Sequence, residues 1–155
     1  MIAFDEIVPA KAVFAGLHVT SKKQLLQELA EKASALFDLD RRVLFETLLE
    51  RERLGSTGVG NGVAIPHGKV AKLPHVVGMF VTLSEPVDFD AVDDRHVDLI
   101  FLLLAPENAG ADHLRALARV SRLLRDREHC EKLRGAETAD AVHALINQPL
   151  ATEAA

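Results

Sequence analysis

The sequence predicts an α/β domain in which a β-sheet is flanked by helices on both faces, a three-layer sandwich. Two amphipathic helical segments come first, strand-like segments fill the middle of the chain, and further helical segments follow. The segment Val97–Ala105 is apolar on consecutive positions, which is typical of a strand with both faces covered. The helices encoded before and after this strand can supply the two covering layers.

Length and composition are those of one globular domain, predicted over residues 1–155. Hydrophobic residues make up 48% and charged residues 26% of the chain, which excludes disorder. The net charge of −5 argues against nucleic acid as a partner. No signal-peptide pattern is present, and the longest apolar run, Leu99–Pro106, is far shorter than the ~20 residues of a membrane span. We therefore expect a cytoplasmic protein without membrane insertion.

Two helices are predicted in the first third of the chain. Ser21 and Gln24 have the spacing of a capping box, so a helix is expected over Ser21–Phe37. Its apolar residues recur at the helical period and predict the buried side: Leu25, Leu26, Leu29, Ala30, Ala33 and Leu36. Asp40 can cap a second helix that ends near Leu54. One side of that helix is predicted to carry Val43, Leu44, Thr47 and Leu48.

Strands and further helices are predicted in the rest of the chain. The strand-like runs are Val63–Ile65, Val76–Leu83 and Val97–Ala105. Asp112 is expected to cap a helix that continues through Leu124. The inward residues of this helix are predicted to be Leu114, Leu117, Ala118, Ser121 and Leu124. Shorter helices are expected around Glu128–Leu133 and Ala139–Ile146, and the tail from Pro149 is expected to be frayed.

His67 is the strongest candidate for a catalytic residue because of the residues around it. Pro66 before it fixes one backbone torsion, and Gly68 after it permits a sharp turn, so the imidazole is presented from a rigid base. Five glycines within Gly55–Gly68 can bring backbone N–H groups together, and such groups bind anions. The same glycines could serve only to build turns, and the spacing alone leaves both interpretations open.

Polar side chains near His67 in the sequence are suited to a phosphate group. Arg51 can offer a planar cation to phosphate oxygens, Ser56 and Thr57 can donate from their hydroxyls, and Asn61 adds an amide. The glycine-rich stretch lacks the pattern of a Walker A loop, a dinucleotide fingerprint or a hydrolase elbow. No metal-ligand spacing is recognisable either, so neither a metal nor another cofactor is expected.

His113 is the second candidate. It lies in the first turn of the helix predicted after Asp112, where the helix dipole tends to keep an imidazole neutral. An imidazole donates one hydrogen bond when neutral and two when protonated, so His113 could stabilise a phosphoryl group if it faces His67. The remaining histidines have no recognisable partner pattern: His18, His75, His96, His129 and His143.

The stretch Arg51–Lys69 resembles the active-site segment of type-2 enzyme IIA domains of the phosphoenolpyruvate-dependent phosphotransferase system. The similarity runs from about Ile7 to Ile146 and includes Phe89–Asp93, Val97–Ala105 and Asp112–Leu114. The family includes fructose, mannitol and nitrogen-regulatory kinds, and the sequence resembles the nitrogen-regulatory kind most. The resemblance implies a mixed β-sheet between helical layers, with the domain core over about residues 7–146.

The resemblance also implies the roles of three residues. His67 would be phosphorylated on Nε2, Arg51 would be the active-site arginine, and His113 would lie near the phosphoryl group. The donor would be a phosphorylated HPr-like carrier, charged by an enzyme I paralogue. The chemistry is consistent with these roles, because histidine is a neutral nucleophile at cellular pH and transfer between histidines needs mainly positioning. We further expect Nδ1 of His67 to donate to a backbone carbonyl, and the surrounding face to be apolar for docking of the carrier.

Three functions remain open from the sequence. The first is a regulator, in which phosphorylation of His67 changes binding to targets such as transporters or sensor kinases in nitrogen- or potassium-related metabolism. The second is a standalone fructose- or mannitol-type IIA protein that passes phosphate to a IIB domain. The lack of a fused IIB, IIC or HPr domain in the sequence favours the first. The third is a binding module whose glycine-rich loop holds a nucleotide or anion without chemistry.

Overall fold

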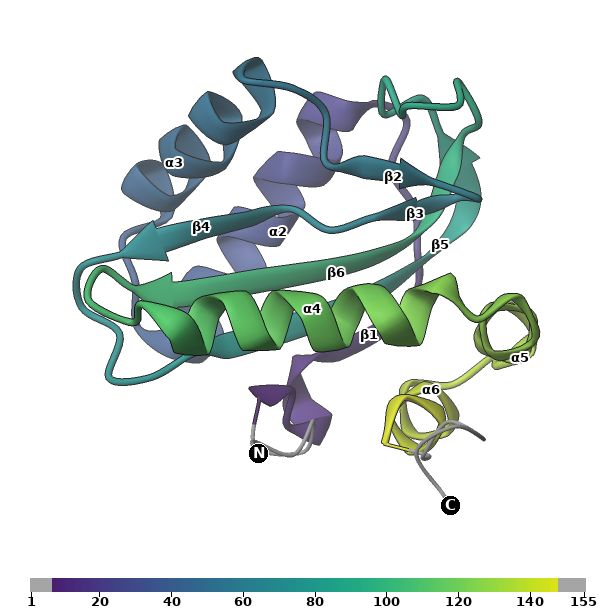
Figure 1. Ribbon diagram of the computed structural model, residues 1–155. Coiled ribbons are helices and arrows are strands. Elements are labelled where there is room, and N and C mark those ends of the chain that lie inside the picture. Colours follow the sequence, from purple (N-terminus) through teal and green to yellow (C-terminus); the bar gives the residue numbers. More distant parts are fainter. Residues whose placement is uncertain (1–6, 148–155) are drawn as a thin grey trace.

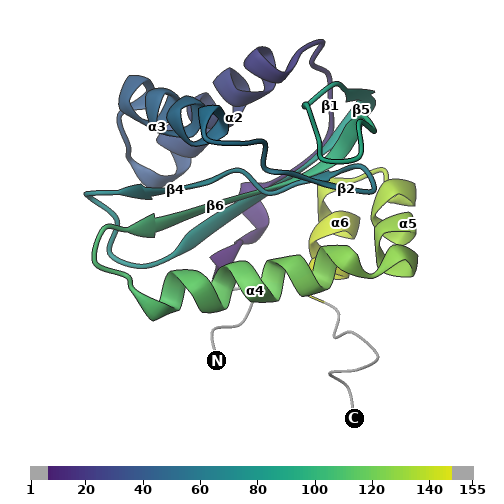
Figure 2. The ribbon, with the colours of Figure 1, turned by 45° about the horizontal axis from the view of Figure 1, so that its top comes forward.

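A computed structural model describes residues 7–147 and has a six-stranded mixed sheet between two helical layers (Figures 1 and 2). Helices α2 (Lys22–Phe37) and α3 (Arg41–Arg53) cover one face of the sheet. Helices α4 (Ala111–Arg125), α5 (Arg127–Gly135) and α6 (Ala139–Ile146) cover the other, and the 3-10 turn η1 (Ala10–Ala12) precedes the first strand. The predicted three-layer α/β sandwich is confirmed. The tail from Pro149 lies outside the described residues.

The long strands β5 (Val77–Val87) and β6 (Val97–Pro106) form the antiparallel centre of the sheet. The edge strand β1 (Val13–Leu17) pairs with β5 in parallel. The strands β2 (Gly58–Gly60), β3 (Val63–Ala64) and β4 (His67–Val70) lie on the other side of β6. Buried aromatic side chains of the two central strands, Phe80 and Phe101, lie with ring centroids 6.0 Å apart in the core.

Strands β3 and β4 run along the same side of β6, one after the other. Val63 pairs with Leu99, and His67 pairs with Leu103, both in parallel register. Between them, Pro66 has no N–H to donate to the ladder, although its carbonyl still accepts from the Leu103 N–H at 3.0 Å. The interruption at Ile65–Pro66 therefore makes His67 the first residue of a new strand.

Helices α2 and α3 begin as their capping residues predict. The Ser21 hydroxyl accepts from the Gln24 N–H, and the Asp40 carboxylate accepts from the Val43 N–H. The predicted buried side of α2 is confirmed, with Leu36 only partly buried. In α3, Val43 lies at the margin of the side predicted from the sequence, and its side chain is 56% exposed. The buried residues of α3 instead follow an i, i+4 stripe: Leu44, Leu48 and Glu52.

The predicted start and inward face of α4 need correction. Gly110 occupies the N-cap without a side-chain hydrogen bond, and Asp112 lies in the first turn, where its carboxylate accepts from Arg115 at 3.3 Å. Leu114 is 68% exposed and Ala118 is exposed as well. The buried residues are Ala116, Val120, Leu123 and Leu124. Both sets of residues have helical spacing, and packing against the sheet selects the second.

Three short strands were absent from the sequence prediction: β1, β2 and β4. Strand β2 consists largely of glycine, and β4 contains Gly68 and Lys69, so neither has the apolar alternation typical of a strand. Their extended conformation depends on pairing with neighbouring strands. Among the residues the structure describes, no helix is long and apolar enough to cross a membrane.

Candidate active site

His67 has its tautomer fixed by two neighbours. Its Nδ1 lies 2.9 Å from the carbonyl oxygen of Ile65, and a carbonyl oxygen only accepts, so Nδ1 carries the ring proton. The Nε atom of Arg51 donates to Nε2 of His67 at 3.3 Å, which requires a lone pair on Nε2. With both contacts made, the half-buried imidazole is neutral and has its lone pair on Nε2. The contact of Nδ1 with a backbone carbonyl is the one expected from the sequence.

Arg51 lies in the last turn of α3 and reaches back over the loop that follows the helix. Its Nη1 donates to the Gly55 carbonyl at 2.9 Å, while its Nε faces His67. The hydrogen bond to Gly55 thus fixes the Arg51 guanidinium and also holds the loop after α3 in place. A cation fixed beside Nε2 of His67 can stabilise negative charge on a group bound at this nitrogen.

His113 lies on α4, which covers the face of the sheet opposite to α3 and Arg51, and its ring faces His67. The two ring centroids are 5.9 Å apart, with an angle of 56° between the ring planes. Nε2 of His113 is buried and has no hydrogen-bond partner among the described residues. An unpartnered buried polar atom costs free energy, so this nitrogen is available to a group that enters the site.

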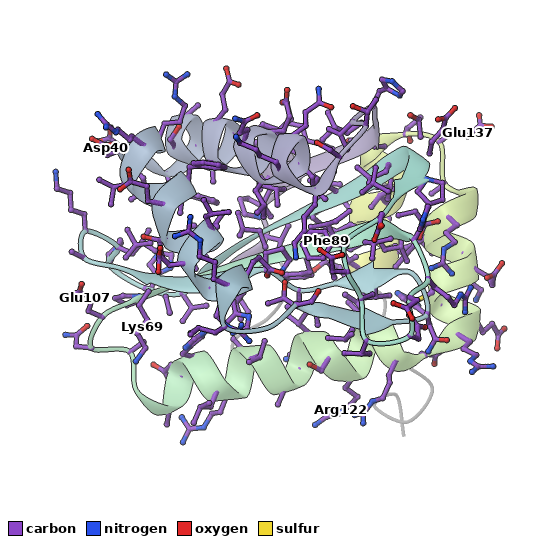
Figure 3. All side chains as sticks on the ribbon, turned by 90° about the horizontal axis from the view of Figure 1, so that it is seen from above. Asp40, Lys69, Phe89, Glu107, Arg122 and Glu137 are labelled. Carbon is purple, nitrogen blue, oxygen red and sulfur yellow. The ribbon has the colours of Figure 1, made fainter. Side chains whose placement is uncertain are left out.

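The pKa of His113 lies below its ordinary value of 6.5. Burial is the main cause, and the neighbouring His67 ring and the Lys69 ammonium lower the pKa further. Figure 3 shows Lys69 at the end of the sheet near the start of α4. The sequence attributed a neutral His113 to the helix dipole, whereas desolvation is the larger effect in the structure. At neutral pH, His113 is a neutral ring that can donate one hydrogen bond.

The hydroxyls of Ser56 and Thr57 are engaged within the protein. Ser56 Oγ donates to the Phe89 carbonyl at 2.8 Å and accepts from the Gly58 N–H at 3.0 Å. Thr57 is buried, and its Oγ1 donates to the carboxylate of Glu52. In this conformation the Ser56 proton is directed at the segment after β5 and the Thr57 proton at the end of α3. Phosphate binding by Ser56 and Thr57 stays a prediction.

Asn61 lies in the turn between β2 and β3 with a positive φ of 57°. Its backbone N–H donates to Asp93 at 2.9 Å, and its side-chain oxygen accepts from Arg95 at 3.3 Å. These contacts tie the turn to the loop before β6. The predicted contribution of Asn61 to phosphate binding is also untested.

Glu52 is a residue that the sequence analysis missed. Its side chain is 4% exposed, and its carboxylate accepts from the Thr57 N–H at 3.0 Å and pairs with Lys22 Nζ at 3.0 Å. Lys22 also lies over the buried ring of Phe89, labelled in Figure 3, with Nζ 4.5 Å from the centroid. Glu52 thus holds the loop directly after Arg51. One feature of the sequence agrees with the burial of Glu52: Glu52 lies four residues after Leu48, in line with the buried stripe of α3.

The surface near the two histidines carries exposed apolar side chains. Leu54 follows the last turn of α3 and is 84% exposed, while Leu114, next to His113, is 68% exposed. Large apolar residues this exposed are suited to contact with another protein. Within residues 7–147, no group of three or more His, Cys, Asp or Glu side chains is placed to hold a metal ion.

The fold and the paired histidines agree with a family that the sequence itself matches. Residues 6–148 match the family described as "Phosphoenolpyruvate-dependent sugar phosphotransferase system, EIIA 2". The chain belongs to this family and is a IIA-type component of the phosphotransferase system.

Relatives within the family are proteins named for nitrogen regulation. The chain is 53% identical over 149 residues to the "Nitrogen regulatory protein" of Bradyrhizobium diazoefficiens, covering 96% of this chain and 97% of the relative. It is 42% identical to the Escherichia coli K12 protein of the same name, covering 84% and 80%. The crystal structure of nitrogen regulatory protein IIA-Ntr from Neisseria meningitidis superposes with a TM-score of 0.86 at 40% identity, covering 91% of this chain and 97% of that one. The chain is thus a IIA protein of the nitrogen-regulatory kind.

Proposed function

We propose that this protein is a regulatory phosphocarrier that accepts a phosphoryl group on Nε2 of His67 from a phosphorylated HPr-like carrier. The observation that carries the proposal is the pair of contacts on the His67 ring. The Ile65 carbonyl accepts the proton of Nδ1, and Nε of Arg51 donates to the lone pair of Nε2. The site therefore presents a neutral nucleophile next to a cation, as transfer of a phosphoryl group requires.

The proposed transfer needs no general base. The Nε2 lone pair forms a bond to phosphorus, while the bond to the donor histidine breaks and its electron pair stays on the donor ring. No proton has to leave Nε2, because the ring proton is on Nδ1 and is held by the Ile65 carbonyl. Positioning in line and stabilisation of the phosphoryl oxygens are then the tasks of the site.

Arg51 and His113 are the proposed stabilising groups. Arg51 can turn its remaining N–H donors to the phosphoryl oxygens, and His113 has a buried Nε2 without a partner among the described residues. Leu54 and Leu114 provide exposed apolar contacts for the carrier next to these groups. The donor chemistry is that of the family, so an HPr-like protein is the proposed partner.

The regulatory role rests on the relatives named nitrogen regulatory protein. In this role, phosphorylated His67 adds negative charge to the docking face and changes binding to target proteins, such as transporters or sensor kinases in nitrogen- or potassium-related metabolism. The alternative is a fructose- or mannitol-type sugar IIA protein. The chain is 34% identical to the fructose-specific EIIABC component of Bacillus subtilis, over 92% of this chain but 23% of that protein.

A phosphotransfer assay tests the proposal. The protein is incubated with phosphoenolpyruvate, enzyme I and an HPr-like carrier that is verified on a known acceptor. Wild type and the control His96→Ala, which changes an exposed histidine, are expected to gain one acid-labile phosphoryl group, whereas His67→Ala gains none. Labelling of folded His67→Ala would refute the site. Rapid transfer from the labelled protein to a fructose- or mannitol-type IIB domain would favour the sugar alternative.

A further inference from the structure

The turn between β2 and β3 approaches the junction of α4 and α5 (Figures 1 and 2). Residues of these elements line a polar cavity. Its volume is about 210 Å³, and four arginines line it: Arg95, Arg125, Arg127 and Arg134. None of Arg51, His67 and His113 contributes to its wall. Asn61, predicted from the sequence to bind phosphate near His67, does line it, so the cavity is separate from the two histidines and Arg51 but not from every predicted site residue.

Two of the four arginines are fixed by hydrogen bonds. Nε of Arg134 lies 2.9 and 3.0 Å from the two carboxylate oxygens of Asp98, and Nη2 donates to the Asn61 carbonyl at 2.7 Å. Its Nη1 lies 3.4 Å from Glu131. Nη1 of Arg95 donates to the side-chain oxygen of Asn61 at 3.3 Å. Both guanidinium groups are thus held on the β2–β3 turn before any ligand arrives.

The other two arginines have no acidic partner within residues 7–147. Arg125 ends α4 and Arg127 begins α5, and neither side chain makes a hydrogen bond or ion pair there. The acid between them, Asp126, accepts from the His129 N–H at 3.0 Å and caps α5. The Asp126 carboxylate is therefore engaged at the start of α5 and is not paired with Arg125 or Arg127.

The charges that line the cavity are mainly positive. Glu131 is the carboxylate in the wall, against the four guanidinium groups, and the nearby Asp98 is already paired with Arg134. Cys130 also lines the cavity, but burial raises the pKa of its thiol, which stays uncharged at neutral pH. The chain as a whole has a net charge of −5, so this excess of cations is local. The guanidinium groups repel one another unless an anion lies between them.

We propose that this cavity binds a small phosphate-bearing anion. Guanidinium groups match phosphate oxygens with two parallel hydrogen bonds, and two free arginines beside two fixed ones can surround one phosphate group or a diphosphate. The volume is below the ~300 Å³ at which pockets for drug-sized ligands begin, so the bound part of the ligand is small. The site would give the protein a metabolite-binding role separate from phosphoryl transfer.

Nuclear magnetic resonance titration with inorganic pyrophosphate tests this proposal. We expect saturable shifts in the amide signals of Arg125, Arg127 and Cys130. The double variant Arg125→Ala/Arg127→Ala should bind at least about tenfold more weakly, because two charge-assisted contacts are lost. The control Arg41→Ala/Arg42→Ala removes the same charge from exposed positions at the start of α3 and should bind as wild type does.

Three results would overturn the proposal. One is shifts confined to Arg51, His67 and His113, which would place the anion at the active site instead. Another is equal weakening in both double variants, which would indicate attraction by net charge alone. The third is no saturation by about 10 mM pyrophosphate, which corresponds to binding weaker than ~3 kcal/mol. If the alanine variant fails to fold, Arg125→Gln/Arg127→Gln removes the charges with less loss of side chain and allows the same comparison.

Discussion

Replacing Glu52 by alanine should destabilise the protein far more than replacing an exposed glutamate of the same helix. The carboxylate of Glu52 is 4% exposed and bonds both the N–H and the hydroxyl of Thr57 as well as Lys22. Its loss leaves a buried N–H of Thr57 without a partner and leaves Lys22 with the exposed carboxylate of Asp90, 3.9 Å away, in place of the buried one. The loop that supports Arg51 through the Gly55 carbonyl is released at the same time.

The magnitude follows from these contacts. Removing one partner of a buried ion pair costs about 3–5 kcal/mol. The side chain of Lys22 is 20% exposed, so water offsets part of this cost, and we expect a loss of about 3 kcal/mol in the free energy of unfolding. At ~2–4 °C per kcal/mol for a chain of this size, the midpoint of thermal unfolding should fall by roughly 6–12 °C.

Thermal unfolding of two matched variants measures the effect. In Glu46→Ala the same side chain is removed from α3, but Glu46 is 65% exposed and lies 3.6 Å from Arg42. That variant should lose less than about 1 kcal/mol. Glu52→Gln, which keeps the shape and loses the charge, should fall between the two. Equal unfolding midpoints for Glu52→Ala and Glu46→Ala would refute the role given to Glu52.

Three further predictions concern the site and its loop. Arg51→Ala should slow phosphoryl transfer by about 10–100-fold without removing the acceptor, since one charge-assisted contact is lost; an unchanged rate in quench-flow measurements would exclude Arg51 from the mechanism. His113 should titrate below pH 6.5, and because the folded protein then binds this proton less tightly than the unfolded chain, its contribution to stability should fall as the pH drops below about 6.5. A midpoint at or above 6.5 for its ring proton signals would contradict this. Gly58→Ala should cost about 1–3 kcal/mol, because a Cβ there would lie 2.8 Å from the Cβ of Ala91, whereas a Cβ at Gly135 meets no atom within 4 Å and Gly135→Ala should be tolerated. Equal unfolding midpoints for these two variants would show that the contact with Ala91 relaxes freely.

The sequence predicted the elements that carry their own local signal. The capping residues Ser21 and Asp40 and the apolar run Val97–Ala105 identified two helices and the central strand. Strands β2 and β4 carry no such signal, because they consist of glycines and polar residues that become extended only by pairing. The inward face of α4 was also assigned wrongly, since Leu114 and Ala116 both fit a helical stripe and only the sheet decides between them.

The sequence singled out His67, Arg51 and His113 but could not show that they lie together. His67 stood out through its flanking proline and glycine, whereas its distance from His113 depends on how α4 crosses the sheet. The sequence does not predict burial of Glu52, because a glutamate between two arginines is typical of an exposed helix face. Its burial arises from the loop at Thr57 that folds back onto the end of α3.

The central claim is that the phosphoryl group is carried by Nε2 of His67, and the phosphorylated protein labelled with nitrogen-15 tests it directly. Long-range proton–nitrogen spectra with phosphorus coupling identify which ring nitrogen bears phosphorus. We predict coupling at Nε2 of His67, with Nδ1 still protonated and bonded to the Ile65 carbonyl. Phosphorus on Nδ1, or on another histidine, would contradict the account.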